Sequence, residues 1–358
     1  MTTPGSAPTS PRAIVAVIGM HRSGTSLTMQ ALGALGAQSG GGLLAGDDFN
    51  RNGYWEAGEV VAFHDRLLEG MGRRWGVPEH LLPLPANWWD SAAADAAHIE
   101  VRALLAARLA LIEPGGILAL KDPRMTLFLP LWTQAAAALG LELRMILCLR
   151  HPGEVAASLA RRDRLDPAMG QALWLAYTLA AIEQAEGQDG AAVPMHVSRL
   201  DEWYANPTGS LARIADFAGL PTEGVVQPFV PDLATQLSEA TIGDPLVASW
   251  WHELVVLPPG RALAPGMVAR ARLLRQGAGQ GAVLAAAIRA EVGETPAHVL
   301  LRDLEAYRGG VDVLQDAYRQ ESEARAAYEA QARRFEDAYT HAQRRLDRLN
   351  PLKWFQKK

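Results

Sequence analysis

Short apolar runs alternate with stretches of helical spacing through the first part of the chain. Residues 13–18 read AIVAVI, a run of strand length, and positions 25–35 follow with apolar residues on one helical face. Three further runs, at 117–120, 143–149 and 193–197, are each followed by a helical pattern. Because crossover helices bury both faces of a parallel sheet, this alternation predicts an α/β fold: a P-loop-like, doubly wound parallel sheet flanked by helices, with a C-terminal helical extension. Helices are expected over 25–35, 57–68, 125–139 and 207–218, and from about 153 onward.

Three polar clusters come directly after these apolar runs. They begin at Gly19, Lys121 and Arg150. Ligands of open parallel sheets bind at the carboxyl ends of the strands, and all three clusters stand at such ends. We therefore expect them to converge on one site.

The pattern changes after Leu257-Pro258-Pro259-Gly260, and glycine-rich turns follow. From 311 to 349 the spacing of aromatic and aliphatic residues resembles a heptad seam, which fits a helix packed on its own domain as well as a coiled-coil homodimer. The last residues combine aromatics with lysines, as peripheral membrane anchors do, with a frayed terminus as the alternative. The predicted organisation is a disordered leader (1–12), an α/β domain (13–257), a helical extension (258–310), a long helix or coiled coil (311–349) and a basic aromatic tail (350–358).

Composition narrows the function classes. The chain has 358 residues, 49% of them hydrophobic, with a net charge of −5. This balance argues against a nucleic-acid partner, which selects for a basic surface. No apolar segment reaches the roughly 18–20 residues of a spanning helix, and the N-terminus lacks the pattern of a signal peptide. The one cysteine, Cys148, lies in an apolar run, so we expect a buried, inert thiol in the cytoplasm, with the C-terminal tail as the feature that could bring the protein to the inner face of the membrane.

The stretch after the first apolar run reads GMHRSGTSL and resembles a Walker A loop without its lysine. Gly19, Gly24 and Ser26 keep the register, while Thr25 takes the place of the lysine. A triphosphate needs that lysine and a magnesium ion to neutralise its charge, whereas a 5′-phosphosulfate carries less charge. Arg22, just before the Ser-Gly-Thr-Ser turn, can supply the cation, and the loop amides can hold a phosphate at the helix N-terminus.

This loop is similar to the 5′-phosphosulfate loop of sulfotransferases that use 3′-phosphoadenosine 5′-phosphosulfate (PAPS), in particular the bacterial carbohydrate-type and tyrosylprotein-type branch. Residues 149–162 resemble the 3′-phosphate motif of the same family, an arginine at a strand end followed by a serine eight residues later. Ser158 and Arg162 lie four apart on one helix face. The resemblance covers residues 13 to about 221. It implies that the donor is bound by Arg22, Ser23, Gly24, Thr25, Ser26, Arg150, Ser158 and Arg162.

The resemblance also implies the catalytic residues. Lys121-Asp122-Pro123 looks like the element whose lysine contacts the transferring sulfuryl group, and residues 50–56 look like the segment that carries an acidic base. The predicted catalytic residues are Glu56, Lys121 and Arg22. Glu56 also fits the N-terminal acid of a helix over 57–68, so His64 and then Asp122, which also fits an ion-pair partner of Lys121, follow it as candidate bases.

Together these features predict a PAPS-dependent sulfotransferase. It would move the sulfuryl group in line to a hydroxyl or amine of a small-molecule or glycan acceptor, such as a carbohydrate or other cell-surface or secondary metabolite, with PAPS as co-substrate and no metal. An ATP-dependent small-molecule kinase and a non-catalytic scaffold of a polysaccharide-assembly complex are the alternatives.

Several sequence features could contact an acceptor, but none identifies it. The insertion over 69–110 has room for a lid over the acceptor. Trp88-Trp89 and Trp250-Trp251 could offer faces to an acceptor ring, although packing in a core or interface is the favoured interpretation. His21 could touch the donor or act as a spacer within the loop.

Overall fold

The structure is a computed structural model, and all the residues it describes belong to the compact unit Met1–Gly279. They are residues 13–46, 53–77, 80, 83–84, 86–185, 193–222, 240–257, 263 and 266–276. Within the predicted extension, residues 266–276 are helical. The predicted leader, the rest of the extension after 276, the predicted helix at 311–349 and the tail lie outside the described residues.

Within the described residues, four parallel strands form the sheet, in the order β2-β1-β3-β4. Their bounds are Ala13–Ile18 for β1, Ile117–Lys121 for β2, Glu142–Leu149 for β3 and Met195–Arg199 for β4. Each predicted apolar run became a strand, although β4 begins two residues later than the run predicted. β1 and β2 are buried along their whole length, as strands covered on both faces must be. The predicted α/β class is confirmed.

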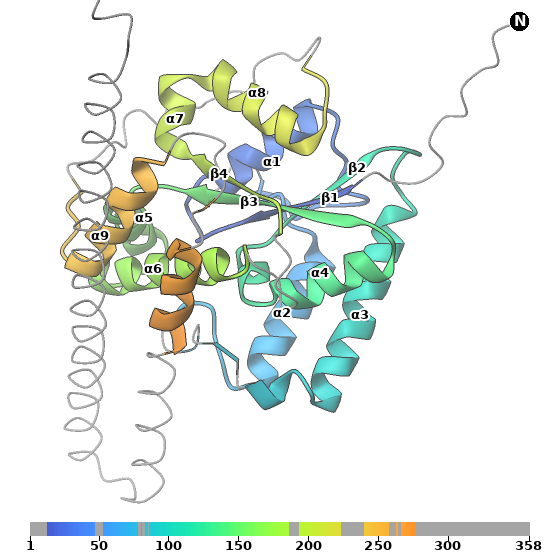
Figure 1. Ribbon diagram of the computed structural model, residues 1–358, viewed down its shortest axis with the longest axis horizontal. Coiled ribbons are helices and arrows are strands. Elements are labelled where there is room, and N and C mark those ends of the chain that lie inside the picture. The colour runs from blue at the N-terminus through green and yellow to red at the C-terminus, as the bar shows by residue number, and fades with distance from the viewer. Residues whose placement is uncertain are drawn as a thin grey trace, which may run out of the picture. The chain divides into compact units, whose positions relative to one another are not determined.

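Helices cover both faces of this sheet, as Figure 1 shows: α1, α7 and α8 lie on one side and α3, α4 and α6 on the other. Proline opens α5, α6, α8 and α9, where its missing N–H is not needed. The helices are α1 (Thr25–Ala34), α2 (Gly58–Gly70), α3 (Ala92–Leu109), α4 (Leu129–Ala138), α5 (Pro152–Asp163), α6 (Pro167–Glu183), α7 (Leu200–Ala205), α8 (Pro207–Ala218) and α9 (Pro245–Val255).

Two predicted segments differ from the structure. The helix expected over 125–139 is divided into a short 3-10 helix, η3 (Pro123–Leu127), and α4, which meet at Phe128. The insertion over 69–110 contains α3, which packs against α4. Ser91 caps α3 by accepting a hydrogen bond from the backbone of Ala94 at 3.2 Å. Part of this insertion is therefore a helix packed against the domain.

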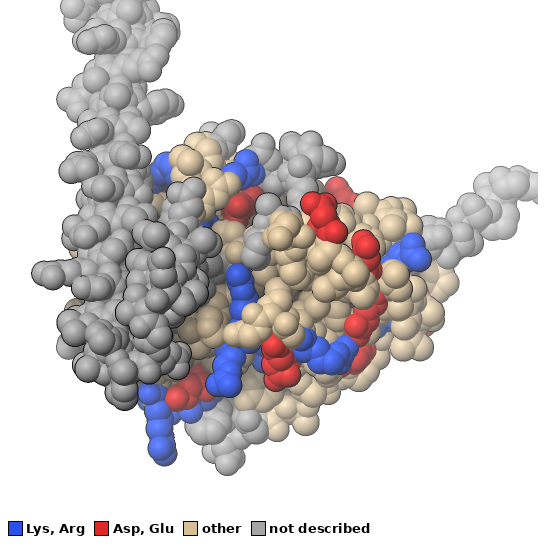
Figure 2. All heavy atoms as spheres, turned by 90° about the horizontal axis from the view of Figure 1, so that it is seen from below, with Lys and Arg blue, Asp and Glu red and all other residues tan. Residues whose placement is uncertain are grey.

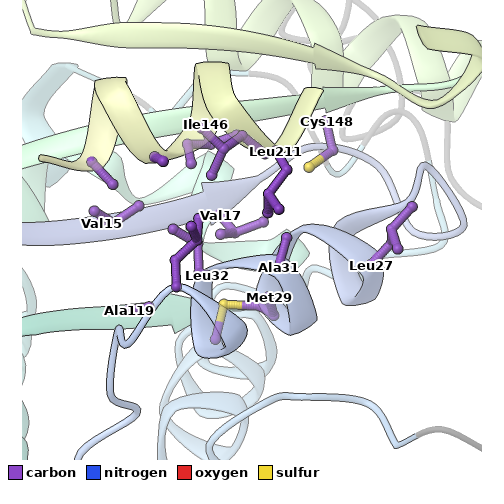
Figure 3. Close-up of a cluster of buried hydrophobic side chains, with 14 of the residues drawn as sticks. Val15, Val17, Leu27, Met29, Ala31, Leu32, Ala119, Ile146, Cys148 and Leu211 are labelled. Carbon is purple, nitrogen blue, oxygen red and sulfur yellow. The ribbon is translucent and has the colours of Figure 1, made fainter. Parts of the chain in front are cut away.

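A hydrophobic cluster fills the space between the sheet and helices α1 and α8 (Figure 3). It joins Val17 of β1 to Leu27 of α1 and Leu211 of α8. Cys148 lies in the same cluster, and burial raises the pKa of its thiol to about 12. The expectation of a buried, inert thiol is confirmed.

The opposite face of the sheet is rich in buried aromatic side chains, among them Trp132, Trp174 and Tyr177. In α9, Trp250 is fully buried and packs in the core as expected, and Trp251 is 8% exposed. Trp88 and Trp89 are partly buried and meet edge-on with ring centroids 4.9 Å apart.

Within the described residues, no helix is both long and apolar enough to cross a membrane. On the face seen in Figure 2, basic and acidic side chains lie interspersed over the described part of the surface.

Candidate functional site

The loop that joins β1 to α1 depends on two glycines. Gly19 has φ 122°, and a Cβ there would lie 2.5 Å from the carbonyl oxygen of Cys148 in β3. Gly24, the N-cap of α1, has φ 92° and faces Leu200. Side chains at these positions would be strained or would clash, so the loop can pass this close to the sheet only with glycine. The Walker-like register thus has a steric basis.

The loop and the N-terminus of α1 have the properties of an anion site. No side chain caps α1, and the hydroxyl of Ser23 is buried without a hydrogen-bond partner within the described residues. Arg22 adopts the left-handed conformation at φ 70°, which is uncommon for a residue with a side chain. An uncapped helix N-terminus presents backbone N–H groups and partial positive charge, and both favour a phosphate or sulfate oxygen.

Both predicted phosphate motifs meet in what we call the arginine cluster: Arg22, Arg150, Glu154 and Ser158. Nε of Arg22 donates to the hydroxyl of Ser158 at 2.9 Å, across 136 positions of sequence. Arg150 donates from Nη1 to the backbone oxygen of Arg22 at 3.4 Å and from Nε to Glu154 at 2.8 Å. Burial, and then the charges of Arg162 and Arg150, lower the pKa of Arg22.

A hollow of about 220 Å³ opens beside Arg150. Leu200, at the start of α7, lines it and also faces Gly24, so the hollow lies next to the loop. Its walls include Tyr204 of α7, which sequence reasoning did not assign to a site, and Trp251 of α9, which the sequence analysis considered as a face for an acceptor ring. The lining residues are Arg150, His151, Glu154, Leu200, Asp201, Tyr204, Ala240 and Trp251.

Lys121 and Glu56 form a buried ion pair. Nζ of Lys121 donates to Oε1 of Glu56 at 2.6 Å and to the backbone oxygen of Tyr54 at 3.0 Å. Ser26 of the loop donates to the same Tyr54 oxygen at 3.4 Å, which ties this pair to α1. Lys121 and Glu56 are 5% and 6% exposed.

The structure answers two questions that the sequence left open: whether Glu56 is the N-terminal acid of a helix, and whether Asp122 is the ion-pair partner of Lys121. The acid in the first turn of α2 is Glu59, and Glu56 precedes the helix, so Glu56 is not the N-terminal acid of that helix. The partner of Lys121 is Glu56, not the adjacent Asp122.

Asp122 belongs instead to a second group, the buried network: His64, Asp122, Arg124 and Trp132. The indole N–H of Trp132 donates to Nε2 of His64 at 3.0 Å, and Nδ1 of His64 lies 2.9 Å from Asp122. Because an indole can only donate, Nε2 accepts, and the proton of a neutral His64 is on Nδ1, where it donates to Asp122. His64 and Asp122 are both 0% exposed.

Arg124 completes the network. Its backbone N–H and its guanidinium donate to the other oxygen of Asp122, at 2.9 and 3.1 Å. Burial alone would raise the pKa of Asp122, but His64 and then Arg124 outweigh it and hold that pKa well below its usual range. Both ring nitrogens of His64 are used inside the core, so its role here is to hold Asp122.

Arg162 makes contacts other than those of the residues with which it was grouped. Its Nε donates to Asp163 at 2.8 Å, and its guanidinium lies 5.7 Å from the centroid of the Trp75 ring. The structure brings Arg22, Ser158 and Arg150 together, while Arg162 acts on Arg22 through its charge.

Among the residues that the structure describes, no group of three or more His, Cys, Asp and Glu residues could hold a metal ion.

Comparisons with known proteins add little to this geometry. No protein-family model matches the chain, and no curated protein sequence matches it significantly. Among solved structures, the sulfotransferase domain of the olefin synthase from Synechococcus PCC 7002 is a structural neighbour: it has 18% identity and a TM-score of 0.38, with 76% of this chain and 97% of that chain covered. An identity and a TM-score this low assign neither a family nor an activity.

Proposed function

We propose that this protein is a PAPS-dependent sulfotransferase that transfers the sulfuryl group to a hydroxyl or amine of a small-molecule or glycan acceptor. The observation that carries the proposal is the 2.9 Å hydrogen bond between Arg22 and Ser158. Two motifs that the sequence relates to the two phosphate groups of one donor lie far apart in the chain and meet at the same edge of the sheet. A donor with a phosphate at each end of its ribose requires such a meeting.

The residues present fit the donor. The uncapped N-terminus of α1 and the unpartnered hydroxyl of Ser23 suit the 5′-phosphate, with Gly24, Thr25 and Ser26 completing the loop. Arg150 and Ser158 suit the 3′-phosphate. The guanidinium of Arg150 is held on one side by Glu154 and lines the hollow, where the nucleoside would lie. Arg162 is a more distant cation of the same site.

Lys121, Arg22 and Glu56 would carry the transfer step. The donor supplies an activated sulfuryl group, and Lys121 and Arg22 would stabilise the charge on that group and on the leaving phosphate. Glu56, whose Oε1 accepts a hydrogen bond from Lys121, would accept the acceptor's proton. His64 has both nitrogens engaged, and Asp122 is bound by His64 and Arg124, which leaves Glu56 as the base in this proposal.

Calorimetric titration with 3′-phosphoadenosine 5′-phosphate (PAP) tests the donor class, with ADP and magnesium as the matched nucleotide. We expect tight binding of PAP and weak binding of ADP, because ADP lacks the 3′-phosphate that Arg150 and Ser158 would bind. The reverse preference would replace the proposal with an ATP-dependent kinase. Binding of neither nucleotide would favour a non-catalytic role.

A further inference from the structure

His21 and Tyr177 place two unpaired polar atoms next to the loop. His21 belongs to the loop and Tyr177 to α6, and their rings meet edge-on with centroids 6.2 Å apart. Within the described residues, neither Nε2 of His21 nor the hydroxyl of Tyr177 has a hydrogen-bond partner, although both atoms are buried. Folded proteins seldom leave such groups unpaired, because each one costs free energy that a partner would recover. Both atoms are therefore available to a ligand group.

The loop that carries His21 leaves the sheet beside the ion pair of Lys121 and Glu56, because Val17 of β1 pairs with Lys121 of β2. Burial, followed by the charges of Arg124, Arg162 and Lys121, holds the pKa of His21 well below its usual value. The ring is therefore neutral at neutral pH and has one nitrogen that can accept a hydrogen bond. In the proposed function, the nearby ion pair of Lys121 and Glu56 is where an acceptor would be activated.

Trp75 lies against His21. Its ring packs against His21 with centroids 4.3 Å apart, and the guanidinium of Arg162 lies 5.7 Å from the centroid of the Trp75 ring. Trp75 is only partly buried, and it lies in the segment between α2 and the short 3-10 helix at Ala86–Trp88. An aromatic ring thus already lies against His21, at the position that the ring of an acceptor would occupy.

We propose that His21 and Tyr177 form the acceptor subsite, that Trp75 covers it, and that the acceptor is a neutral aromatic ring with a single hydroxyl group. The inference rests on the proposed sulfotransferase function. The acceptor's ring would displace the indole of Trp75, and its hydroxyl would pair with His21 and Tyr177. A sugar carries several hydroxyl groups that each need a partner when buried, whereas this pair of residues offers two polar atoms.

Equilibrium binding of 2-naphthol to the full-length protein saturated with PAP tests the proposal without turnover. N-acetylglucosamine serves as the sugar probe. We expect 2-naphthol to bind and the sugar not to bind. His21→Phe and Tyr177→Phe keep the rings and remove the polar atoms, so each should weaken 2-naphthol binding, by about tenfold for His21→Phe. Trp75→Ala should strengthen binding several-fold, because no ring then has to be displaced.

Matched controls separate this test from a loss of folding. His98→Phe changes a histidine on the outer helix α3 and should leave 2-naphthol binding unchanged. The thermal midpoint and the PAP dissociation constant are measured for every variant. We expect both to stay near the wild-type values, which shows that the fold and the donor site are intact.

The outcomes distinguish the two proposals. If PAP does not bind the wild-type protein, the sulfotransferase function itself fails. If PAP binds but the sugar is taken in place of 2-naphthol, or His21→Phe and Tyr177→Phe bind 2-naphthol as the wild type does, the acceptor subsite is wrong and the donor site stands. Weaker binding by Trp75→Ala would show that Trp75 is a wall of the site and not its cover.

Discussion

The arginine cluster and the buried network lie at the same edge of the sheet and are both built from charged side chains, yet they differ in how completely the protein satisfies them. In the buried network, Asp122 and His64 are fully buried, and each has partners for its polar atoms. In the arginine cluster, Arg150 lines a hollow, and the hydroxyl of nearby Ser23 has no partner within the described residues. Polar groups whose hydrogen bonds are made within the protein stabilise the fold. Polar groups without a partner in the protein are available to a ligand.

This contrast makes a simple expectation about substitutions. Changes in the buried network should lower the free energy of unfolding, and changes in the arginine cluster should lower the affinity for the donor.

The largest effect is expected for Asp122→Ala. Removing this carboxylate leaves Nδ1 of His64 and part of Arg124 without a partner in the core. Breaking a buried pair in this way costs about 3–5 kcal/mol of unfolding free energy, measurable by urea denaturation. Asp90→Ala, in an exposed position, is the control. A loss below about 1 kcal/mol would show that the network does not support the fold.

The same carboxylate should make stability depend on pH. The pKa of Asp122 is lower in the folded protein than in the unfolded chain. Its contribution is therefore complete above the unfolded-chain pKa of about 4 and is lost as the pH falls toward the folded value. Urea midpoints measured from pH 6 downward should fall more steeply below about pH 4 for the wild type than for Asp122→Asn. Parallel curves for the two proteins would contradict this assignment.

Arg150→Ala tests the arginine cluster. Loss of a charged group that binds a phosphate should raise the dissociation constant of PAP by about 100-fold, as calorimetry would measure. Arg161→Ala changes an exposed arginine of the same helix, α5, and should alter the constant by less than about twofold. Because Arg150→Ala leaves Glu154 unpaired, the double variant with Glu154→Gln checks that the effect is not repulsion from that carboxylate. An unchanged constant in both variants would remove Arg150 from the donor site.

Trp132→Phe is expected to have an intermediate effect, again on stability. It deletes the N–H that donates to His64 and leaves a small cavity, at a cost of about 2 kcal/mol. Nitrogen chemical shifts of the His64 ring should show a single Nδ1–H tautomer in the wild type and a mixture in the variant. A mixture in the wild type would argue against the hydrogen-bond order described here.

The smallest effect is expected for Ser158→Ala, which removes the hydroxyl that bonds to Arg22. A hydrogen bond from a charged guanidinium contributes about 1.5 kcal/mol, so the dissociation constant of PAP should rise about tenfold and the thermal midpoint should hardly change. A shift in the midpoint without a change in affinity would assign Ser158 to the fold and not to the donor site.

Much of the arginine cluster could be predicted from sequence because its parts are local. One continuous loop contains the glycines, Arg22 and the start of α1. A second continuous stretch, just after β3, contains Arg150, Glu154 and Ser158 at intervals of four residues. Each stretch shows its pattern without knowledge of the rest. The buried network has no such pattern: it draws His64 from α2, Asp122 from the end of β2 and Trp132 from α4.

The same reason explains what sequence reasoning missed around His21. Tyr177 lies in the middle of an apolar helix, where an aromatic residue signals only packing, and Trp75 lies in a segment without periodicity. Tyr204 and Trp251 line the hollow beside Arg150, and no spacing links them to it.

The sequence by itself determined the parallel α/β fold, the strand ends where polar clusters stand, and the loop that suits a phosphate, because periodicity and local turns are short-range properties of the chain. Only the tertiary structure decided which partner each charge has. It paired Lys121 with Glu56, gave Asp122 to His64 and Arg124, turned Arg162 toward Trp75 and enclosed His21. Ion pairs and burial depend on packing between elements distant in sequence, and no local pattern specifies that packing.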